Sequence, residues 1–333
     1  MDCPHGVNRA DHSTNKAVFI RPTCTVVRPI VISLVTVVKP IVNSLTDTHI
    51  RPDRAAGLHL IQPRGAHGAE AIASWRLRLE PGASATFRRD TEETIVILQN
   101  GRATWAADGQ TWTVSRQNVF RERATALYLP PGVELTCTGL PEIPNPEISK
   151  SPNSGITECI LISTAAPAGG RAVLLRGDEI EVHQRGRGNY AREVHDLFVR
   201  DSHVRRLMVG ETFNPPGHWS SFPPHKHDGL NGEPRLEEVY HYRPDPPQGF
   251  GHQMLYAAGG ESVTHVVRDG DVVVLPYGYH PVSSPPGYHL YYLWAMVGDE
   301  RKLALYEDPD HRWIHDAPDA AARPERSGPQ GPA

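Results

Sequence analysis

The stretch SVTHVVRDGDVVVLPYGYHPV, residues 262–282, carries the clearest signal for the fold. Two runs of β-branched residues flank Asp269 and Gly270, and the second run ends in a proline and a glycine. An apolar run, a DG turn and a second apolar run are typical of a β-hairpin. The stretch therefore predicts antiparallel strands.

Similar runs recur from His49 onward at spacings of about ten residues, which is typical of an antiparallel sandwich or barrel. The turn sequences EPG, QNG, ADG and PPG separate them. LYLPPG and VLPYG end matching runs in the two halves, so we infer an internal duplication. We predict an all-β chain of two tandem antiparallel sandwich or barrel domains of the jelly-roll type.

The length of 333 residues supports two domains, because a domain usually holds about 150 residues. We place the N-terminal domain at 49–170 and the C-terminal domain at 171–315. The Arg- and Gly-rich segment 171–198 is predicted to be the crossover between them, and the Pro- and Ser-rich segment 141–155 a surface insertion.

Both ends of the chain are predicted to be disordered, over residues 1–48 and 316–333. For the apolar segment 24–45, the alternative to disorder is an extra strand that adds to a sheet edge. We do not predict a membrane span there, because Arg28, Pro29, Lys39 and Pro40 interrupt the run before the roughly 18 apolar residues that a span needs.

The charge and cysteine content narrow the function classes. The formal net charge is −4, and no block of Lys and Arg is present that could follow a phosphate backbone, so nucleic acid is not an expected partner. The four cysteines lack CxxC spacing and are too few for a disulfide framework, which favours a reducing cytoplasm.

The sequence PPHKHD, residues 223–228, begins a candidate metal site. His225 and His227 are two apart, so in a strand they point to the same face. Either Glu237 or Glu238 of the following EEVYHY run adds a carboxylate, and His280 adds a third imidazole. Three imidazoles and one carboxylate suit one divalent ion such as Zn, Mn, Fe, Co or Ni. The alternatives are a surface loop for the first two histidines and a hydrogen-bonded core histidine for the third.

The N-terminal half lacks this set of residues. Its corresponding run has Glu92 and Glu93, but it has no HxH sequence, and no histidine follows LYLPPG. We therefore predict a cupin-like N-terminal domain without a metal site, which packs, borders a pocket or contributes to an oligomer.

Residues 170–315 resemble a known family through six motifs: RGRGNYAREV, HWSSFPPHKHD, EEVYHYR, PPQGFGHQMLY, GDVVVLPYGYHPVSSPPGYHLYYLWAMVG and DPDHRWI. The family is the bicupins that include 5-deoxy-glucuronate isomerases and 4-deoxy-L-threo-5-hexosulose-uronate ketol-isomerases. The first half matches only loosely. The leading fifty residues, the 141–155 insertion and His218, where an Asn is expected, depart from the pattern.

The resemblance implies a bicupin fold, with His225, His227, Glu238 and His280 as the metal ligands. It also implies an aldose-ketose isomerase that converts 5-deoxy-D-glucuronate to 5-dehydro-2-deoxy-D-gluconate in myo-inositol catabolism. A small sugar acid is then the partner, and a homo-oligomer is an open question. The alternatives are another sugar-acid isomerase and an Fe(II) cupin dioxygenase; a non-catalytic bicupin would be expected to lack the ligand set in both halves.

Isomerisation needs a group that moves a proton and groups that hold the substrate. The catalytic candidates are Tyr240 and Tyr242, which share the Glu238 face by strand parity, together with Glu237, Tyr279 and metal-bound hydroxide. A guanidinium group binds a carboxylate with two hydrogen bonds. The substrate-binding candidates are Arg185, Arg187 and Arg192, with Gln248 and Gln253 for the sugar hydroxyls.

Overall fold

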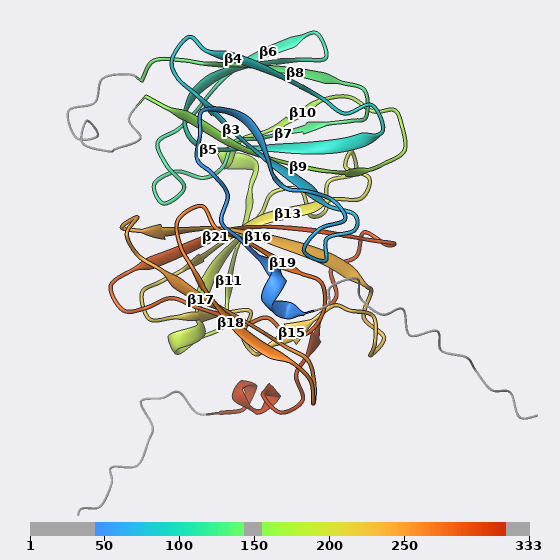
Figure 1. Cartoon of the computed structure of the whole chain (residues 1–333), viewed down its shortest axis with the longest axis vertical. Coiled ribbons are helices and arrows are strands. Elements are labelled where there is room, and N and C mark those ends of the chain that lie inside the picture. Colours follow the sequence, from blue (N-terminus) through green and yellow to red (C-terminus); the bar gives the residue numbers. More distant parts are fainter. Residues whose placement is uncertain (1–43, 143–154, 318–333) are drawn as a thin grey trace, which may run out of the picture. The chain divides into compact units, whose positions relative to one another are not determined.

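The fold is described from a computed structural model, which covers residues 44–142 and 155–317 (Figure 1). Most of the predicted N-terminal extension, most of the 141–155 insertion and nearly all of the C-terminal tail lie outside the described residues. Within the described ranges, the regular structure consists of strands and short 3-10 helices, without an α-helix. The predicted all-β class is confirmed.

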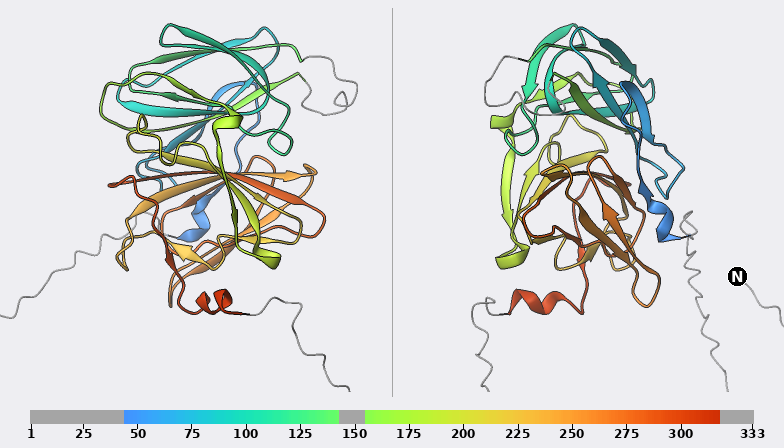
Figure 2. Two further views of the ribbon diagram at one scale, coloured as in Figure 1. Left: turned by 180° about the vertical axis from the view of Figure 1, so that it is seen from behind. Right: turned by 60° about the vertical axis from the view of Figure 1, so that its left-hand side comes forward.

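The N-terminal half forms one nine-stranded sheet in which β5 is the longest strand. The first part of β5 pairs with β7 and β9, and its second part pairs with β6 and β8, so the sheet curls around one interior (Figure 2). The strands are β2 (Gly57–Gln62), β3 (Ala73–Leu79), β4 (Ser84–Arg88), β5 (Glu92–Ala107), β6 (Gln110–Arg116), β7 (Ala126–Leu129), β8 (Glu134–Gly139), β9 (Thr157–Ala165) and β10 (Val173–Leu175).

The C-terminal half contains a seven-stranded, a four-stranded and a two-stranded sheet. The seven-stranded sheet holds β1 (His49–Ile50), β19 (Val272–Leu275), β16 (Leu236–Asp245), β21 (His289–Gly298), β13 (Met208–Asn214), β12 (Arg192–Asp196) and β11 (Glu181–Arg185), in that order. The four-stranded sheet holds β14 (Trp219–Ser220), β20 (Val282–Ser283), β17 (Gly251–Tyr256) and β18 (Ser262–Val267). The remaining elements are β15 (His225–Lys226), β22 (Tyr306–Glu307), η1 (Leu45–Thr48), η2 (Gly177–Glu179), η3 (Gly188–Tyr190) and η4 (Arg312–His315).

The central strands of the two halves repeat one arrangement. The strand order is β7-β5-β9-β3 in the first sheet and β19-β16-β21-β13 in the second. The register repeats as well, since Thr94 of β5 is opposite Leu129 and Glu238 of β16 is opposite Leu275. These leucines belong to the LYLPPG and VLPYG sequences from which we inferred the duplication.

Two segments cross the predicted domain boundaries. Residues 44–48 were predicted to be disordered, but Leu45 is buried, and Thr48 Oγ1 lies 2.9 Å from His265 Nε2. The following strand, β1, pairs with β19 of the C-terminal sheet, so the blue segment lies against orange strands in Figure 1. In the predicted crossover, β10 pairs with β7 of the N-terminal sheet. Each half therefore supplies an edge strand to the sheet of the other.

Alternation along β5 and β16 divides the core into three clusters. Ile95 and Ile97 pack with Val239 between the two halves. Val96 and Leu98 fill the interior of the N-terminal half, whereas Tyr240 and Tyr242 face the interior of the C-terminal half. Successive strand residues point to opposite faces, so one strand contributes to two clusters. No helix within the described ranges is long and apolar enough to cross a membrane.

Candidate metal centre

Three buried side chains meet in the interior of the C-terminal half. Glu238 comes from β16, His227 follows β15, and His280 follows β19. His227 Nε2 lies 2.9 Å from Glu238 Oε2, and His280 Nε2 lies 3.5 Å from the same oxygen. One ligand atom from each residue falls within 4.8 Å of the others. His227 and His280 are 53 positions apart in the sequence, and the strand order brings them together.

Backbone contacts aim the two imidazoles at this point. His227 Nδ1 lies 2.7 Å from the carbonyl oxygen of Leu236, and His280 Nδ1 lies 3.0 Å from that of Gly278. Each Nδ1–H donating to a carbonyl leaves Nε2 as the lone-pair nitrogen, which is how protein histidines are usually oriented toward a metal.

The residues pass a chemical test for a metal site. His280 Nε2 and Glu238 Oε1 are buried and have no hydrogen-bond partner in the structure. Unpartnered buried polar atoms are costly, and they are rare unless an ion or water completes them. Two unpartnered ligand atoms in one cluster of His and Glu are what a divalent cation site requires.

His225 lies at the edge of the cluster. Its ring packs edge-on to that of His280, with 4.8 Å between the centroids, and the residue lines the neighbouring cavity. Burial lowers the pKa of His225 to about 3 and that of His280 well below its usual value, so both imidazoles are neutral at neutral pH. Burial also acts to lower the pKa of His227, but the contact with Glu238 raises it overall.

A cavity of about 550 Å³ opens beside the cluster. His225, Glu238 and Tyr240 line it, and so do Arg185 and Arg192. The two arginines are directly opposite each other in the β11–β12 pair. Two of the three predicted arginines therefore lie at the cavity that adjoins the cluster.

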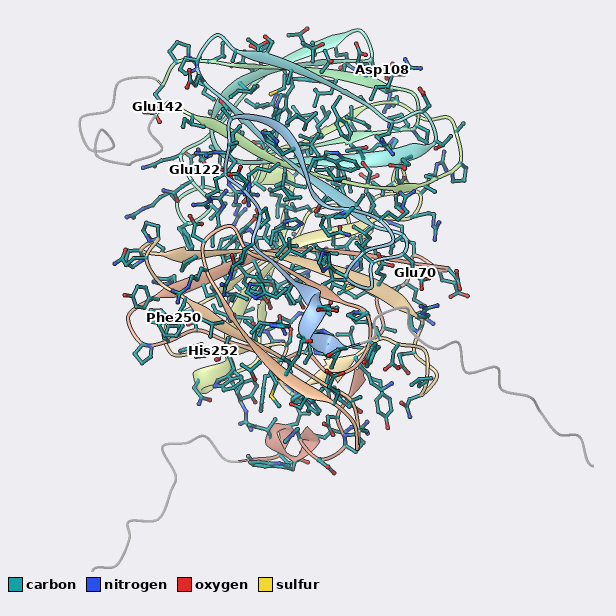
Figure 3. All side chains as sticks on the ribbon, viewed as in Figure 1. Glu70, Asp108, Glu122, Glu142, Phe250 and His252 are labelled. Carbon is teal, nitrogen blue, oxygen red and sulfur yellow. The ribbon has the colours of Figure 1, made fainter. Side chains whose placement is uncertain are left out.

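The remaining substrate-binding candidates lie elsewhere. Arg187 Nη2 lies 2.8 Å from the carbonyl oxygen of Ile314. Gln248 is exposed in the turn before β17; Phe250, which directly precedes β17, and His252, which belongs to it, are labelled in Figure 3. Gln253 is fully buried, and its amide nitrogen donates to the carbonyl oxygen of His280 at 2.9 Å. The structure brings none of these three into the cavity.

Tyr240 and Tyr242 share the Glu238 face of β16 but differ in their surroundings. Tyr240 lines the cavity, and its hydroxyl lies 3.3 Å from Ser221 Oγ. Tyr242 is behind it and donates its hydroxyl hydrogen to the side-chain oxygen of Gln253. Burial raises the pKa of both phenols well above the usual value. Tyr242 and Gln253 thus connect β16 to the backbone of His280 and do not line the cavity.

Two further catalytic candidates lie away from the cavity. Glu237 is on the opposite face of β16, where its carboxylate accepts hydrogen bonds from backbone N–H groups. Burial raises its pKa, and these N–H groups act against the shift. Tyr279 packs against Tyr256, with 5.1 Å between the ring centroids. His218, the departure from the family pattern, contacts the carbonyl oxygen of Ala191 at 2.8 Å.

Sequence reasoning missed several residues of the cavity wall. Tyr292 stacks on Tyr240 with 4.4 Å between the ring centroids, and its hydroxyl donates to Ser220 Oγ at 2.8 Å. Tyr292, Trp294 and Met296 alternate along β21, and all three line the cavity. Parity places these three on one face, but only the pairing of β16 with β21 shows which face that is.

The N-terminal half has no equivalent cluster within its described residues. Thr94 occupies the position in the repeat that Glu238 occupies in the second half. Val96 and Leu98 occupy the positions of Tyr240 and Tyr242, and they pack into an apolar interior. The second group of three potential ligands, Glu181, His183 and Asp196, is on the more exposed β11–β12 pair of the C-terminal half.

Comparison with solved structures supports the cupin-type fold. An IolB-like protein from Salmonella typhimurium superposes with a TM-score of 0.72 at 29% identity, covering 80% of this chain and 99% of that one. Oxalate decarboxylase from Lactobacillus farciminis superposes with a TM-score of 0.55 at 12% identity, covering 83% and 90% of the two chains. At this lower identity the likeness concerns the fold alone, and it confirms the predicted bicupin class.

Curated relatives agree with the predicted resemblance. The 5-deoxy-glucuronate isomerase of Geobacillus kaustophilus is 35% identical over 251 residues, which cover 72% of this chain and 85% of the relative. That of Bacillus licheniformis is 32% identical over 247 residues. The prediction of an isomerase is thereby confirmed. The sequence model of the KduI/IolB family matches residues 48–314, and the chain therefore belongs to the KduI/IolB family.

Proposed function

We propose that the chain is a metal-dependent isomerase that converts 5-deoxy-D-glucuronate to 5-dehydro-2-deoxy-D-gluconate. The substrate is inferred from the similarity of this chain to 5-deoxy-glucuronate isomerases. The observation that carries the metal dependence is the pair of unpartnered ligand atoms, His280 Nε2 and Glu238 Oε1, beside a cavity whose lining includes Arg185 and Arg192. His225, His227, Glu238 and His280 hold one divalent ion in this proposal.

The reaction moves a proton from the carbon beside the aldehyde to the aldehyde carbon. No net oxidation occurs, and negative charge develops on two neighbouring oxygens of an enediol. His225, His227, Glu238 and His280 would hold a divalent ion that, when bound, would supply Lewis-acid stabilisation of that charge. The protein must then hold the substrate, keep the reacting carbons in place and provide a proton at an oxygen.

Arg192 and Arg185 are proposed to bind the carboxylate of the substrate. They are opposite each other on β12 and β11 and line the same cavity as Glu238. Arg192 Nη1 also donates to the carbonyl oxygens of Tyr190 and Phe222, each at 3.2 Å, which fixes the guanidinium group. A guanidinium group already held in place loses little conformational entropy when it binds a carboxylate.

Tyr240 is proposed to act as the proton donor at a substrate oxygen. Its hydroxyl is at the cavity, near Ser221, and the stacking on Tyr292 fixes the ring. Because burial raises the pKa of Tyr240 well above its usual value, the phenol keeps its proton at neutral pH. A protonated hydroxyl can donate to an oxygen that gains negative charge in the transition state.

A proton NMR time course in deuterated water tests the proposed reaction. Purified protein is incubated with 5-deoxy-D-glucuronate, before and after removal of metal by a chelator. We expect the substrate signals to disappear, deuterium to enter the ketose at the former aldehyde carbon, and chelation to stop both. An unchanged spectrum from folded, metal-loaded protein would exclude this substrate, and consumption of oxygen would indicate a dioxygenase instead.

A further inference from the structure

Glu237 binds a turn of the N-terminal half. Its side chain leaves β16 on the face opposite Glu238, and its carboxylate accepts hydrogen bonds from three consecutive backbone N–H groups. Glu70, labelled in Figure 3, donates at 2.6 Å, Ala71 at 2.9 Å and Ile72 at 2.8 Å. Consecutive N–H groups in a turn form a concave site for an anion. The contact therefore joins the start of β16 to the turn before β3.

A glutamate of the N-terminal half binds a turn of the C-terminal half in the same way. Glu93, at the start of β5, accepts hydrogen bonds from the backbone N–H groups of Arg205 and Arg206, each at 2.8 Å, and of Leu207 at 2.7 Å. These residues form the turn before β13 in the C-terminal half. Each half thus inserts one glutamate into a backbone turn of the other.

The register shows that the two glutamates are equivalent. Thr94 and Glu238 occupy the same position in the repeat, so the residues that precede them, Glu93 and Glu237, do too. The accepting turns are also equivalent, because β3 and β13 pair with β9 and β21 respectively. The two contacts form a symmetric pair around the duplication, and we call them the glutamate latches.

Only the Glu237 latch is next to metal ligands. The residue that follows it is Glu238, whereas the residue that follows Glu93 is Thr94. Leu236, the residue before Glu237, holds His227 through two hydrogen bonds. The Leu236 N–H donates to the carbonyl oxygen of His227 at 2.8 Å, and the Leu236 carbonyl oxygen accepts from His227 Nδ1 at 2.7 Å. A shift of β16 at Glu237 would therefore move both His227 and Glu238.

We propose that Glu237 is a positioning residue for the metal centre, and that the N-terminal half acts through this latch to hold His227 and Glu238 in place. The inference rests on the proposed metal site. In this proposal the N-terminal half, which lacks metal ligands, helps to position the ligands of the C-terminal half. Direct hydrogen-bond partners of metal ligands typically change metal affinity by about 10- to 100-fold when removed, and Glu237 acts one step further out, through the backbone of β16.

Two matched variants test the inference. Glu237→Gln and Glu93→Gln each replace a carboxylate by an amide, whose NH2 group cannot accept the N–H donors of the turn. Each variant weakens one latch, because the amide oxygen can still accept hydrogen bonds while the NH2 group cannot, and only the first latch adjoins the ligands. The dissociation constant for Zn2+ is measured by competition with a chromophoric chelator, and thermal denaturation of each metal-free protein is measured in parallel.

We expect both variants to denature at a lower temperature than the wild type. Glu237→Gln should bind Zn2+ at least about tenfold more weakly, whereas Glu93→Gln should bind it as the wild type does. Equal affinity in all three proteins, or the same loss in both variants, would overturn the inference. If Glu237→Gln does not fold, Glu237→Asp, which retracts the carboxylate by one methylene, is judged by the same criterion. A wild-type protein that binds no Zn2+ would contradict the metal site itself.

Discussion

Tyr240 lines the cavity beside the candidate metal cluster. It is two positions beyond Glu238 on β16, and its ring lies 6.2 Å from that of His280. Its stacking partner Tyr292 is held by Ser220. The ring position therefore depends on packing, while the hydroxyl contacts Ser221 at the cavity.

Substitution of Tyr240 by Phe separates these two properties. The ring and its stacking remain, and only the proposed donor is lost. We predict that kcat falls by about 100-fold or more, as is usual for removal of a general acid, with a small change in KM. Steady-state kinetics measures both. Tyr279→Phe, outside the cavity, is the control and should leave kcat unchanged; an equal loss in the two variants would refute the proposed role.

Arg192 offers a second prediction at this scale. Lysine keeps the charge in Arg192→Lys but cannot form the two parallel hydrogen bonds of a guanidinium group. We predict that KM rises by about tenfold or more while kcat changes little, because the lost contact is to a non-reacting group. Arg187→Lys, which alters an arginine outside the cavity, should leave KM as in the wild type. A fall in kcat with unchanged KM for Arg192→Lys would argue against carboxylate binding.

Strand parity accounts for how far single residues could be predicted. It placed Tyr240 and Tyr242 on the Glu238 face, and the structure has them there. It left Glu237 and Glu238 as alternatives, because parity separates two faces without showing which one is the interior. The cavity-lining Tyr292 was missed for the same reason: its position depends on pairing with a strand 50 residues earlier, since Tyr242 is its partner.

At the scale of the strand, β13 contains a glycine that shapes the cavity. A Cβ atom at Gly210 would lie 2.2 Å from the ring of Trp294, which lines the cavity, and 2.5 Å from the carbonyl oxygen of His195. The absence of a side chain lets the indole approach the backbone of the strand closely. This close approach explains why the sequence has glycine in the interior of a strand, where it is otherwise unfavourable.

We predict that Gly210→Ala destabilises the protein by about 1–3 kcal/mol, because the added methyl group must displace the Trp294 ring or the backbone. Urea denaturation measures the change in the free energy of unfolding. Gly260→Ala is the control, since the nearest atom to its Cβ would be the side chain of Ala257 at 3.3 Å. A variant at position 210 as stable as the wild type would show that the indole has room to move.

The turn sequences predicted most elements but not their partners. The runs around DG, PPG and PYG do form strands, since β18 and β19 flank Asp269 and Gly270. However, these two strands do not pair with each other: β18 pairs with β17, and β19 pairs with β16 and β1. A turn signal indicates where a strand ends, whereas the partner is chosen by packing over the whole half.

At the scale of the whole chain, a buried ion pair joins the two halves. Arg116 of β6 donates two hydrogen bonds to the carboxylate of Glu211 on β13, at 2.7 and 3.0 Å. Both side chains are fully buried, and Tyr291 donates its hydroxyl hydrogen to the same carboxylate at 2.8 Å. The halves therefore share charged contacts as well as the apolar cluster between them.

Removing one partner of this pair should be costly. We predict that Arg116→Met lowers the free energy of unfolding by about 3 kcal/mol or more, because Glu211 is then a buried charge without its cation. The double variant Arg116→Met with Glu211→Leu should regain part of the loss, since no charge remains unpaired. Chemical denaturation of the four proteins measures the coupling, and strictly additive losses would contradict it.

The contacts between the two halves could not be predicted from the sequence. The duplication was readable from repeated turns, and the HxH spacing of His225 and His227 predicted a candidate metal site, where the structure brings His227 together with Glu238 and His280. In contrast, the exchange of β1 and β10 and the two glutamate latches arise from residues that meet only when both halves have folded. No local pattern marks a glutamate that accepts backbone N–H groups more than a hundred residues away.

The proposed mechanism needs one divalent ion held by four residues of the C-terminal half. The metal content of the purified protein, measured after reloading with Zn2+ and removal of the excess and compared with that of Glu238→Gln, tests this requirement. We expect one ion per wild-type chain, retained through gel filtration, and loss of the ion from the folded variant. Wild-type protein without a retained ion, or a variant that retains it equally well, would rule out the proposed site.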